Sequence, residues 1–589
     1  MKFLNAIASY TSLLHIFSTQ VLSKTIEVDW DITFVEANPD GLQKRRVIGV
    51  NNQFPLPRLE GTVGDTIIVN AKNSLDRTTS LHAHGLAFNN NVFSDGAVSV
   101  NNCGIPPGQN YTYTLDLTEQ GTYWFHSHSG GDYADGLRTP LIVHPTNETM
   151  YTKYDDDIIL TLSDWYHEEA YTLGKFLTSS KNPAGYEPPP NSGMINDRIE
   201  NSFPVSKDTT YRLRLINTST MAVFHVKVDG HEMSLIEIDG VDIKPVTLNS
   251  VELHPAQRAS VLINTKNSTG FNYLIHADMD PDYFDEVPDT LTMNITASLI
   301  YDQSSGLSSA EDHTWDTIDE SELEPIIEEA YQAPDQEIVI VSDIMQLDDG
   351  APHGLINGIT YRMPKVPILL SMLTMGEDAT NPLVYGPRSN AFVTGYNTTV
   401  RVVIENVHLD AHPFHLHGHK FQVVSSGEGS YANADEIKPP SDDWNPVRRD
   451  TVLVPGEGHA VIQFVSNNPG AWPIHCHNNW HMMFGMMGVI VEAPLEAQKM
   501  IKYDPSQIES QCTLNGFKIS GNAGGDTGLN LSNAPNSPTM INYGIHAKGI
   551  VAIVFCVIAA LMGISSTIFF AKQLSDDTNY ERRMLLQPE

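Results

Sequence analysis

The segment Trp472-Pro-Ile-His-Cys-His-Asn-Asn-Trp-His-Met-Met-Phe-Gly-Met486 carries the most specific pattern of this chain. A thiolate, two imidazoles and a weak axial thioether form the trigonal site in which proteins hold an electron-transfer copper. Cys476, His481 and Met486 supply three of these ligands, so the second imidazole must come from another segment. Side chains alternate between the two faces of an extended strand. We therefore expect Cys476 to face one metal site and its two flanking histidines to face another, which predicts a short covalent path for electrons.

Pairs of the form His-x-His extend this pattern to an early part of the chain. Two histidines at positions i and i+2 of a strand share one face, as chelation of a metal requires. A single pair is usually coincidence or ordinary packing, whereas four pairs, one with a central cysteine, predict metal ligands. The pairs are His82/His84, His126/His128, His415/His417 and His475/His477, and His412 precedes the third.

The body of the chain has the pattern of an all-β protein. Short segments rich in β-branched residues, such as 66–70 (TIIVN) and 399–404 (TVRVVI), alternate with Gly, Pro, Asn and Asp turns. Long amphipathic helical patterns are scarce, so we expect β-sandwich or barrel domains. The expected divisions are three domains over 24–145, 146–300 and 336–512, an acidic, helix-prone linker over 301–335, and a flexible Gly-, Asn- and Ser-rich stalk over 513–548.

Apolar segments near both ends indicate a membrane protein of the secretory pathway. Residues 1–23 are typical of a signal peptide. Residues 549–571 are uncharged and long enough to span a bilayer as a helix, with a buried core helix as the alternative. Basic residues after this segment predict a cytosolic tail over 572–589. We therefore expect a single-pass type I protein whose bulk is extracellular or lumenal.

Composition limits the classes of function. The 589 residues are too many for one core, and a content of 41% hydrophobic and 18% charged residues is typical of folded domains. The formal charge of −36 argues against nucleic-acid binding, which needs basic patches. The acidity favours solubility outside the cytosol, and attraction of metal cations is the alternative. Sequons that predict glycosylation lie at Asn110, Asn217, Asn294 and Asn397.

The four cysteines predict one disulfide. Cys476 is a metal ligand in the pattern above, and Cys556 lies in the predicted span. Cys103 and Cys512 remain, and an oxidising compartment would pair them, which would link the first domain to the end of the last. Two free thiols are the alternative.

From about Thr25 to Glu492 the chain resembles the multicopper oxidases. The segments that carry the resemblance are 82–85 (HAHG), 124–128 (WFHSH), 412–419 (HPFHLHGH), 475–481 (HCHNNWH), 229–231 (DGH) and 238–240 (IDG). The family implies three cupredoxin-like Greek-key domains that hold four copper ions. One mononuclear type 1 copper would lie in the third domain, and a trinuclear cluster would lie between the first and third domains.

The resemblance assigns a ligand to each copper. Electrons would enter at type 1 and pass through Cys476 and its flanking histidines to the cluster, where O₂ is reduced to water. Asp95 would be an acid beside the cluster. The implied ligands are His412, Cys476, His481 and axial Met486 for type 1; His82 and His415 for type 2; and His84, His126, His128, His417, His475 and His477 for the type 3 pair.

Within the family, the chain resembles the fungal membrane-anchored ferroxidases, which oxidise Fe(II) and commonly work beside an iron permease. Glu187, in the segment 185–188 (GYEP), matches a carboxylate that binds iron in that group. His353 and His408 stand where that group has a Tyr and an Asp. Asp410 lies two residues closer to His412 and is a further candidate for an iron contact.

Two residues depart from these relatives in ways that affect the redox chemistry. Met486 stands where many fungal relatives have Leu or Phe, and a thioether donates electron density to Cu(II), so we predict a lower type 1 potential. Asn479 stands where the ferroxidases have a Glu implicated in proton delivery. An amide does not deliver protons as a carboxyl group does, so we predict slow O₂ reduction.

Other functions and destinations stay open at this point. A laccase-like oxidase of phenols, aromatic amines or cell-wall precursors is one alternative. A cuprous oxidase is another, given Met482, Met483, Met486 and Met487, although these also suit hydrophobic packing. A copper-holding protein without catalysis is a third. The tail segment 581–586 (ERRMLL) matches an acidic dileucine signal, so the destination is the cell surface or a vacuolar or endosomal membrane.

Overall fold

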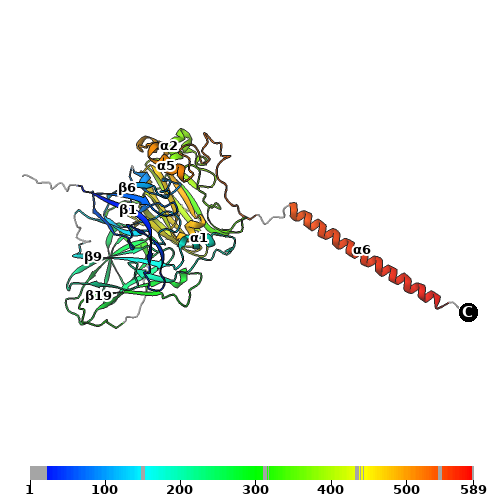
Figure 1. The fold of residues 1–589 in the computed structure, drawn as a ribbon, viewed down its shortest axis with the longest axis horizontal. Coiled ribbons are helices and arrows are strands. Elements are labelled where there is room, and N and C mark those ends of the chain that lie inside the picture. Colours follow the sequence, from blue (N-terminus) through cyan, green and yellow to red (C-terminus); the bar gives the residue numbers. More distant parts are fainter. Residues whose placement is uncertain are drawn as a thin grey trace, which may run out of the picture. The chain divides into compact units, whose positions relative to one another are not determined.

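The computed structural model describes residues 23–89, 91–146, 153–309, 315, 318–431, 437, 439–441, 443–541 and 547–586. The chain forms two compact units, Met1–Thr539 and Met540–Glu589 (Figure 1). The described residues of the first unit form six sheets, which occur as three successive pairs along the chain, together with short helices. Apart from residue 23, the predicted signal peptide lies outside the described residues.

The first pair of sheets contains the first two histidine pairs. Its sheets have the strand orders β2-β1-β4-β6 and β3-β8-β7-β5. In β4, Ile67, Val69 and Ala71 are buried and alternate with more exposed residues, which is the period-2 pattern of a strand with one face on a core. The elements are β1 (Thr25–Ala37), β2 (Arg45–Val50), β3 (Leu59–Thr62), β4 (Thr66–Asn73), β5 (His82–His84), η1 (Val92–Ser94), β6 (Asn110–Asp116), β7 (Gly121–His126) and β8 (Arg138–His144).

The second pair has the orders β10-β9-β12-β17-β14-β15 and β11-β19-β18-β13-β16. The elements are β9 (Asp156–Trp165), α1 (Ala170–Leu177), β10 (Ser192–Ile195), β11 (Asn201–Pro204), β12 (Thr210–Asn217), β13 (Phe224–Val228), β14 (Met233–Ile238), β15 (Val241–Leu248), β16 (Val251–Leu253), β17 (Arg258–Asn264), β18 (Tyr273–Met279), η2 (Pro281–Tyr283) and β19 (Asn294–Ile300).

The third pair has the orders β21-β20-β23-β28-β25-β26 and β22-β30-β29-β24-β27. The central strand β29 ends at Cys476 and is paired on both sides. The elements are β20 (Gln336–Gln346), β21 (Pro352–Ile356), α2 (Ile368–Thr374), η4 (Gly376–Thr380), η5 (Pro382–Tyr385), β22 (Ala391–Thr394), β23 (Thr398–Asn406), β24 (His412–Leu416), β25 (Phe421–Glu428), β26 (Arg448–Arg449), β27 (Thr451–Val454), β28 (Gly458–Ser466), β29 (Gly470–Cys476), α3 (Asn479–Phe484), β30 (Met487–Glu492), α4 (Pro494–Met500) and α5 (Pro505–Leu514).

A disulfide joins the first and third pairs of sheets. Cys103 and Cys512 are bonded across 409 residues, which confirms the predicted pairing. Cys512 lies in α5, beside α2, and packs against Val366 and Leu370 (Figure 1). The limits of the three domains remain a proposal from the sequence.

The acidic segment before the third pair is not helical where the structure describes it. Between residues 301 and 335, the described part contains only the short 3-10 helix η3 (Glu320–Glu322). The segment instead lies along the third pair of sheets: Arg449 forms an ion pair with Glu320, and the Tyr331 amide donates to the Trp444 carbonyl. These contacts provide hydrogen bonds that a helix would otherwise supply.

The segment 513–548 was predicted to be a flexible stalk. As far as Thr539, it is instead bound to the rest of the first unit. The Lys518 amide donates to the Lys365 carbonyl at 2.7 Å, and Ala523 is fully buried. The Thr539 amide and hydroxyl both donate to Asp348. Turns held by the buried Asn522 side chain satisfy the backbone groups of this segment, so a Gly- and Asn-rich composition does not leave it free.

The second unit contains α6 (Ala547–Met584). Residues Gly549–Met584 include an 18-residue window with a mean hydropathy of 2.5, enough to cross a membrane by length and composition. The helix contains the predicted span over 549–571 and continues beyond it, so the start of the predicted tail is also helical.

Candidate metal centre

Three ligand atoms of the expected type 1 site lie together in the third pair of sheets. The Cys476 Sγ lies 3.4 Å from the Nδ1 of His481 and 3.8 Å from the Nδ1 of His412, and the two Nδ1 atoms are 2.9 Å apart. All three side chains are buried. The spacing of one thiol and two imidazoles is that of a trigonal set around a single ion.

The turn of the chain after α3 brings Met486 back beside Cys476. Cys476 ends β29, and the Asn478 side chain caps α3 by accepting from the Trp480 amide at 2.9 Å. Gly485 then adopts a φ of 103° and ends the helix. The Cys476 amide donates to the Met486 carbonyl at 3.2 Å, which fixes the return.

A glycine on the neighbouring strand β21 allows this close packing. A Cβ on Gly354 would lie 2.8 Å from the Cβ of Met486, so only glycine fits there without a shift. Met486 itself is fully buried. The loop that carries the predicted axial ligand is therefore enclosed between α3 and β21.

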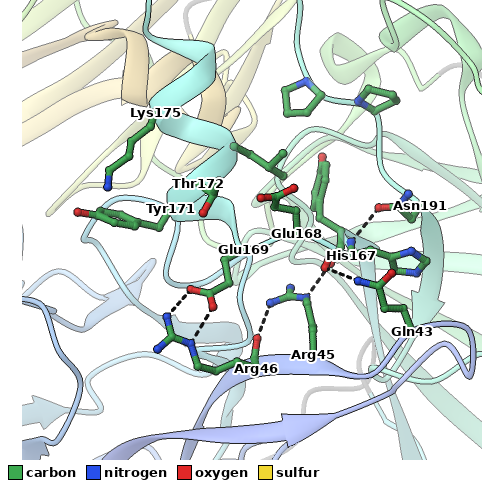
Figure 2. A pocket seen from close by; sticks show the side chains of 14 residues that line it. Gln43, Arg45, Arg46, His167, Glu168, Glu169, Tyr171, Thr172, Lys175 and Asn191 are labelled. Atoms are coloured by element: carbon green, nitrogen blue, oxygen red, sulfur yellow. Dashed lines mark hydrogen bonds and ion pairs between the residues drawn. The ribbon is translucent and has the colours of Figure 1, made fainter.

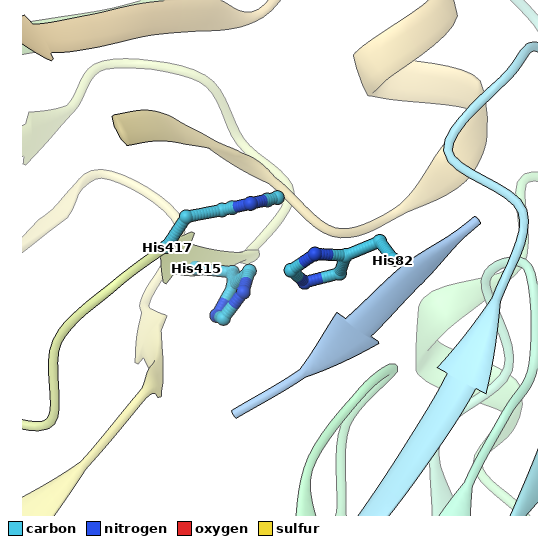
Figure 3. Close-up of side chains that lie close together, drawn as sticks. All are labelled: His82, His415 and His417. Carbon is cyan, nitrogen blue, oxygen red and sulfur yellow. The ribbon is translucent and has the colours of Figure 1, made fainter. Parts of the chain in front are cut away.

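Eight histidines meet between the first and third pairs of sheets. His82 pairs with His126 across β5 and β7, and His415 pairs with His475 across β24 and β29. The rings of His82 and His417 stack with centroids 4.0 Å apart. Figure 3 shows His82 approaching His415 and His417 from the opposite side. The eight are His82, His84, His126, His128, His415, His417, His475 and His477, all buried.

The side chains of His475 and Cys476 point to opposite faces of the strand, as the two-residue period of a strand predicts. The His475 Nε2 lies 3.2 Å from the His417 Nε2, within the eight-histidine cluster. Its neighbour Cys476 instead faces His412 and His481. One peptide bond therefore links the thiol of one site to an imidazole of the other.

The unpaired nitrogens of the cluster fit a bound metal. In four rings, one nitrogen contacts a carbonyl or carboxylate oxygen: His82 at the Asp95 carbonyl, His84 at the Asp450 carboxylate, His126 at the Ser127 carbonyl and His415 at the Asp450 carbonyl. The other nitrogen of each ring is buried and has no partner. Metal-bound histidines show this arrangement, in which the outer nitrogen donates to the protein and the inner one binds the ion.

Burial favours the neutral form of seven of the eight imidazoles in the cluster. Burial lowers the pKa of His84, His126, His128, His415, His417 and His477 well below the usual value, and lowers that of His475 to about 4. A neutral imidazole is the form that binds a metal. The residues therefore fit copper in donor type, position and protonation.

Asp95 contacts ligands from both sheet pairs. Its carboxylate lies 2.9 Å from the His417 Nδ1 and 3.1 Å from the His82 Nδ1, and it is fully buried. The Asn101 amide donates to it at 2.5 Å. It is the acid that the sequence placed beside the cluster.

Glu187 reaches the outer edge of the type 1 ligands. Its Oε1 lies 2.7 Å from the Nε2 of His481, the ring nitrogen opposite the one that faces Cys476. The Asn478 amide donates to both Glu187 carboxylate oxygens at 3.2 Å. Burial lowers the pKa of His481, but the charges of Glu187 and Cys476 outweigh it and raise that pKa well above its usual value.

A cavity of about 420 Å³ opens over this edge. Glu187, Asp285, Asp410 and His481 line it. The Glu187 amide donates to Asp285 at 2.7 Å. Burial raises the pKa of Asp285, and the charges of Glu187 and Asp410 act in the same direction. Asp280, Asp282 and Glu428 also line this cavity. Like charges this close disfavour one another's ionised form, and a bound cation would offset that repulsion.

His408 and His353 lie elsewhere around the type 1 ligands. The His408 ring stacks on His412 with centroids 5.5 Å apart, and its Nδ1 lies 3.4 Å from the Asp410 carboxylate. His353, on β21, pairs with Asp349 at 3.0 Å. Asp410 therefore reaches the cavity, whereas His353 is held by a carboxylate of its own hairpin.

The comparisons with known proteins show the family of this chain. Family models for multicopper oxidases match residues 31–148, 156–304 and 361–496. This chain belongs to the multicopper oxidases. It is 38% identical to the iron transport multicopper oxidase fetC of Epichloe festucae, with 92% of this chain and 88% of that protein covered. It is 38% identical to fio1 of Schizosaccharomyces pombe, another iron transport multicopper oxidase, with 94% and 90% covered.

Solved structures show the same relation. The structure of Fet3p, a multicopper oxidase that functions in iron import, matches this oxidase with a TM-score of 0.81 and 32% identity, over 89% of this chain and all of that one. A laccase from Botrytis aclada matches with a TM-score of 0.72 and 26% identity, over 83% and 92% of the two chains. The cupredoxin-like fold and the copper-dependent oxidase class predicted from sequence are confirmed.

Asn479 of this oxidase is buried in a place with few polar partners. Its side-chain amide lies 3.8 Å from the Met483 sulfur, and its carbonyl oxygen has no partner. The backbone amide of Asn479 donates to the Thr220 carbonyl at 2.9 Å. Among the described residues, no hydrogen bond links the Asn479 side chain to an acid, and the effect on O₂ reduction stays a prediction.

Another cavity of the oxidase lies away from the predicted copper ligands. It measures about 750 Å³ and lies beside α1, as Figure 2 shows. Its basic groups are paired within the protein, Arg46 with Glu169 and Arg45 with the Tyr166 carbonyl. None of the predicted copper ligands lines it, so it carries no part of the proposed chemistry.

Sequence reasoning missed two residues beside Glu187. Asp285 belongs to an acidic stretch over 278–289, for which the sequence favours a solvated loop and leaves binding of a metal or a permease as the alternative; nothing in that stretch distinguishes Asp285 from its neighbours. Asn478 follows the ligand His477 and looks like a spacer in the sequence. The only available signal was its preference for the N-cap position of a short helix.

Proposed function

We propose that this oxidase is a ferroxidase that oxidises Fe(II) in the acidic cavity and reduces O₂ to water. The observation that carries the proposal is the contact of 2.7 Å between the Glu187 carboxylate and the His481 imidazole. This contact places an anionic metal ligand directly on a predicted type 1 ligand. The names of the relatives, which are iron transport oxidases, support the same substrate.

We propose four copper ions. When bound, copper supplies one-electron oxidation at the mononuclear site and four-electron reduction of O₂ at the cluster. The type 1 ion would be held by His412, Cys476, His481 and Met486; the type 2 ion by His82 and His415; and the type 3 pair by His84, His126, His128, His417, His475 and His477.

The cavity carboxylates bind and orient the iron. Glu187, Asp285 and Asp410 provide the oxygen ligands that iron accepts, and oxygen anions favour Fe(III) over Fe(II), which makes the substrate a better reductant. Asn478 holds the Glu187 carboxylate against His481 through two hydrogen bonds. The electron path of this chain then runs from Glu187 through His481 and Cys476 to the two histidines that flank the cysteine.

The buried acid Asp95 handles protons at the cluster. Its carboxylate accepts hydrogen bonds from His417 and Asn101, so a proton at this carboxylate is within reach of ligands from both sheet pairs. Asn479 does not add a second proton donor. We therefore infer that reoxidation by O₂, rather than iron oxidation, limits turnover.

We also propose that α6 anchors the oxidase in a membrane, with the sheet domains on the extracellular or lumenal side. The destination is the cell surface or a vacuolar or endosomal membrane. An iron permease in the same membrane is the proposed partner, because Fe(III) formed in the cavity needs an acceptor that carries it across.

The test compares the rate of O₂ consumption with Fe(II) and with hydroquinone. A ferroxidase gives the higher kcat/KM with Fe(II), and Glu187→Gln lowers that value while Glu168→Gln, which alters an acid of the large cavity beside α1, leaves it unchanged. A fast hydroquinone rate beside a negligible Fe(II) rate would instead assign a laccase-like function. No O₂ consumption with either reductant by the copper-loaded protein would assign a copper-holding role.

A further inference from the structure

One face of the middle sheet β11-β19-β18-β13-β16 carries a cluster of histidines and carboxylates. His225 on β13 pairs with Glu252 on β16 and with Asp278 on β18. His254 and Asp280 follow these partners by two residues, and the Asp280 amide donates to the carbonyl of Val223, the residue before β13. Because side chains repeat with a period of two, all five side chains share one face of the sheet.

Each histidine of this cluster is held by a carboxylate through one ring nitrogen. The His225 Nε2 lies 3.0 Å from Asp280, and the His254 Nε2 lies 2.7 Å from Glu252. Electrostatic interactions also link Glu252 to His225 and Asp280 to His254, so the two pairs form one cluster. These pairs fix both rings with Nε2 as the donor and the lone pair on Nδ1.

The remaining nitrogens have no partner. The Nδ1 atoms of both His225 and His254 are buried without a hydrogen bond, and the two side chains are nine-tenths or more buried. Diagonal neighbours on adjacent antiparallel strands are about 7–8 Å apart, within reach of one another's long side chains. A buried imidazole nitrogen without a partner is unfavourable unless a ligand occupies the space beside it.

The cluster borders the cavity over the type 1 ligands. His254, Asp280 and Asp282 line the same cavity of about 420 Å³ as Glu187 and His481. The His254 ring packs edge-on against Tyr283 at 5.2 Å, and the His225 ring stacks on Trp315 at 5.2 Å. The aromatic rings hold the imidazoles in place at one end of an acidic space.

We propose that His225 and His254, oriented by Asp280 and Glu252, bind a second divalent first-row transition-metal ion next to the cavity. Imidazole ligands select such ions over Mg²⁺ and Ca²⁺, which prefer oxygen ligands. Histidines whose outer nitrogen donates to a carboxylate are typical of metal sites. Binding at this site does not depend on the iron chemistry at Glu187. Its role as a holding site for Fe(II) before oxidation rests on the proposed function.

The test is an anaerobic titration of the reduced, copper-loaded full-length protein with Co(II). Reduced copper is colourless, so the visible bands of bound Co(II) report the added sites. Wild type is expected to bind one more equivalent than the double variant His225→Gln/His254→Gln, in which each Gln retains an N–H donor for its carboxylate. The matched control is His144→Gln, which changes an imidazole paired with Glu60 on the first sheets and should bind as wild type.

Two further variants keep the proposal testable if the double variant does not fold. Glu252→Gln is expected to weaken Co(II) binding by roughly 10–100-fold, since it removes a carboxylate that orients a ligand. Glu187→Gln is expected to leave this equivalent in place. Equal Co(II) stoichiometry and affinity in wild type, the double variant and Glu252→Gln would overturn the proposal. If wild type binds the extra Co(II) but oxidises hydroquinone and not Fe(II), the proposed function is overturned instead of this site.

Discussion

The Asn478 side chain caps helix α3 and also holds the Glu187 carboxylate, and two substitutions can separate these roles. Its carbonyl oxygen accepts from the Trp480 amide at 2.9 Å and caps α3, while its amide donates to both oxygens of Glu187 at 3.2 Å. Serine is as good an N-cap as asparagine but is too short to reach Glu187. Alanine removes both interactions. Asn478→Ser and Asn478→Ala therefore form a matched pair.

The expected magnitudes follow from these contacts. A hydrogen bond to a charged group is worth roughly 1.5–3 kcal/mol, and the lower value suits two long bonds of 3.2 Å. A loss of about 1.4 kcal/mol is a factor of ten in a rate ratio. We expect kcat/KM for Fe(II) to fall about tenfold in both variants. Only Asn478→Ala should also lose about 1 kcal/mol of local stability from the missing cap.

The assay is steady-state O₂ consumption with Fe(II) and with hydroquinone, which needs no metal ligand. Both variants should keep the hydroquinone rate and the blue type 1 absorption of wild type. An unchanged kcat/KM for Fe(II) in Asn478→Ser would refute the positioning role. A fall in Asn478→Ala alone would show that only the helix cap matters.

Three other outcomes test the account of this oxidase. Met486→Leu should raise the type 1 potential, because the thioether no longer donates to Cu(II); a spectroelectrochemical titration that finds an equal or lower potential would contradict this. Asn479→Glu should speed reoxidation of the reduced protein by O₂ in stopped-flow experiments, and an unchanged rate would remove Asn479 as the cause of slow turnover. Joint replacement of Cys103 and Cys512 by serine should lower the guanidinium midpoint, since chain entropy alone assigns about 6 kcal/mol to a crosslink across so long a loop; an unchanged midpoint would show that packing of α5 suffices.

The clustering of the proposed copper ligands was predictable because their pattern is local. A His-x-His pair on a strand fixes two side chains on one face, and Cys476 between two histidines fixes the opposite face. The pairing of His415 with His475, and of His82 with His126, joins these local patterns into one cluster. The assignment needed only strand periodicity and the resemblance.

The surroundings of Glu187 were not predictable in the same way. Asp285 lies 98 residues from Glu187 and reaches it through packing of separate loops. Asn478 has a local role in the helix cap, but its second contact crosses 291 residues. Contacts between loops depend on how whole sheets dock, which neither composition nor spacing encodes.

The segment after Leu514 shows the limit of composition. Gly, Asn and Ser predict a flexible chain when their polar groups are solvated. Here the side chain of Asn522 accepts from two backbone amides, and its own amide donates to the carbonyls of Gly528 and Asn530. One buried amide therefore orders a stretch that composition alone assigns to a stalk.

The most direct test of the iron site is a single turnover without O₂. The oxidised, copper-loaded protein is mixed with four equivalents of Fe(II), one electron for each proposed copper ion, and bleaching of the blue type 1 band is followed by stopped flow. We predict rapid bleaching in wild type, and bleaching at least about tenfold slower in Glu187→Gln, because both the iron ligand and the charged contact of 2.7 Å to His481 are lost. Bleaching at the wild-type rate in Glu187→Gln, with its copper content intact, would contradict the account.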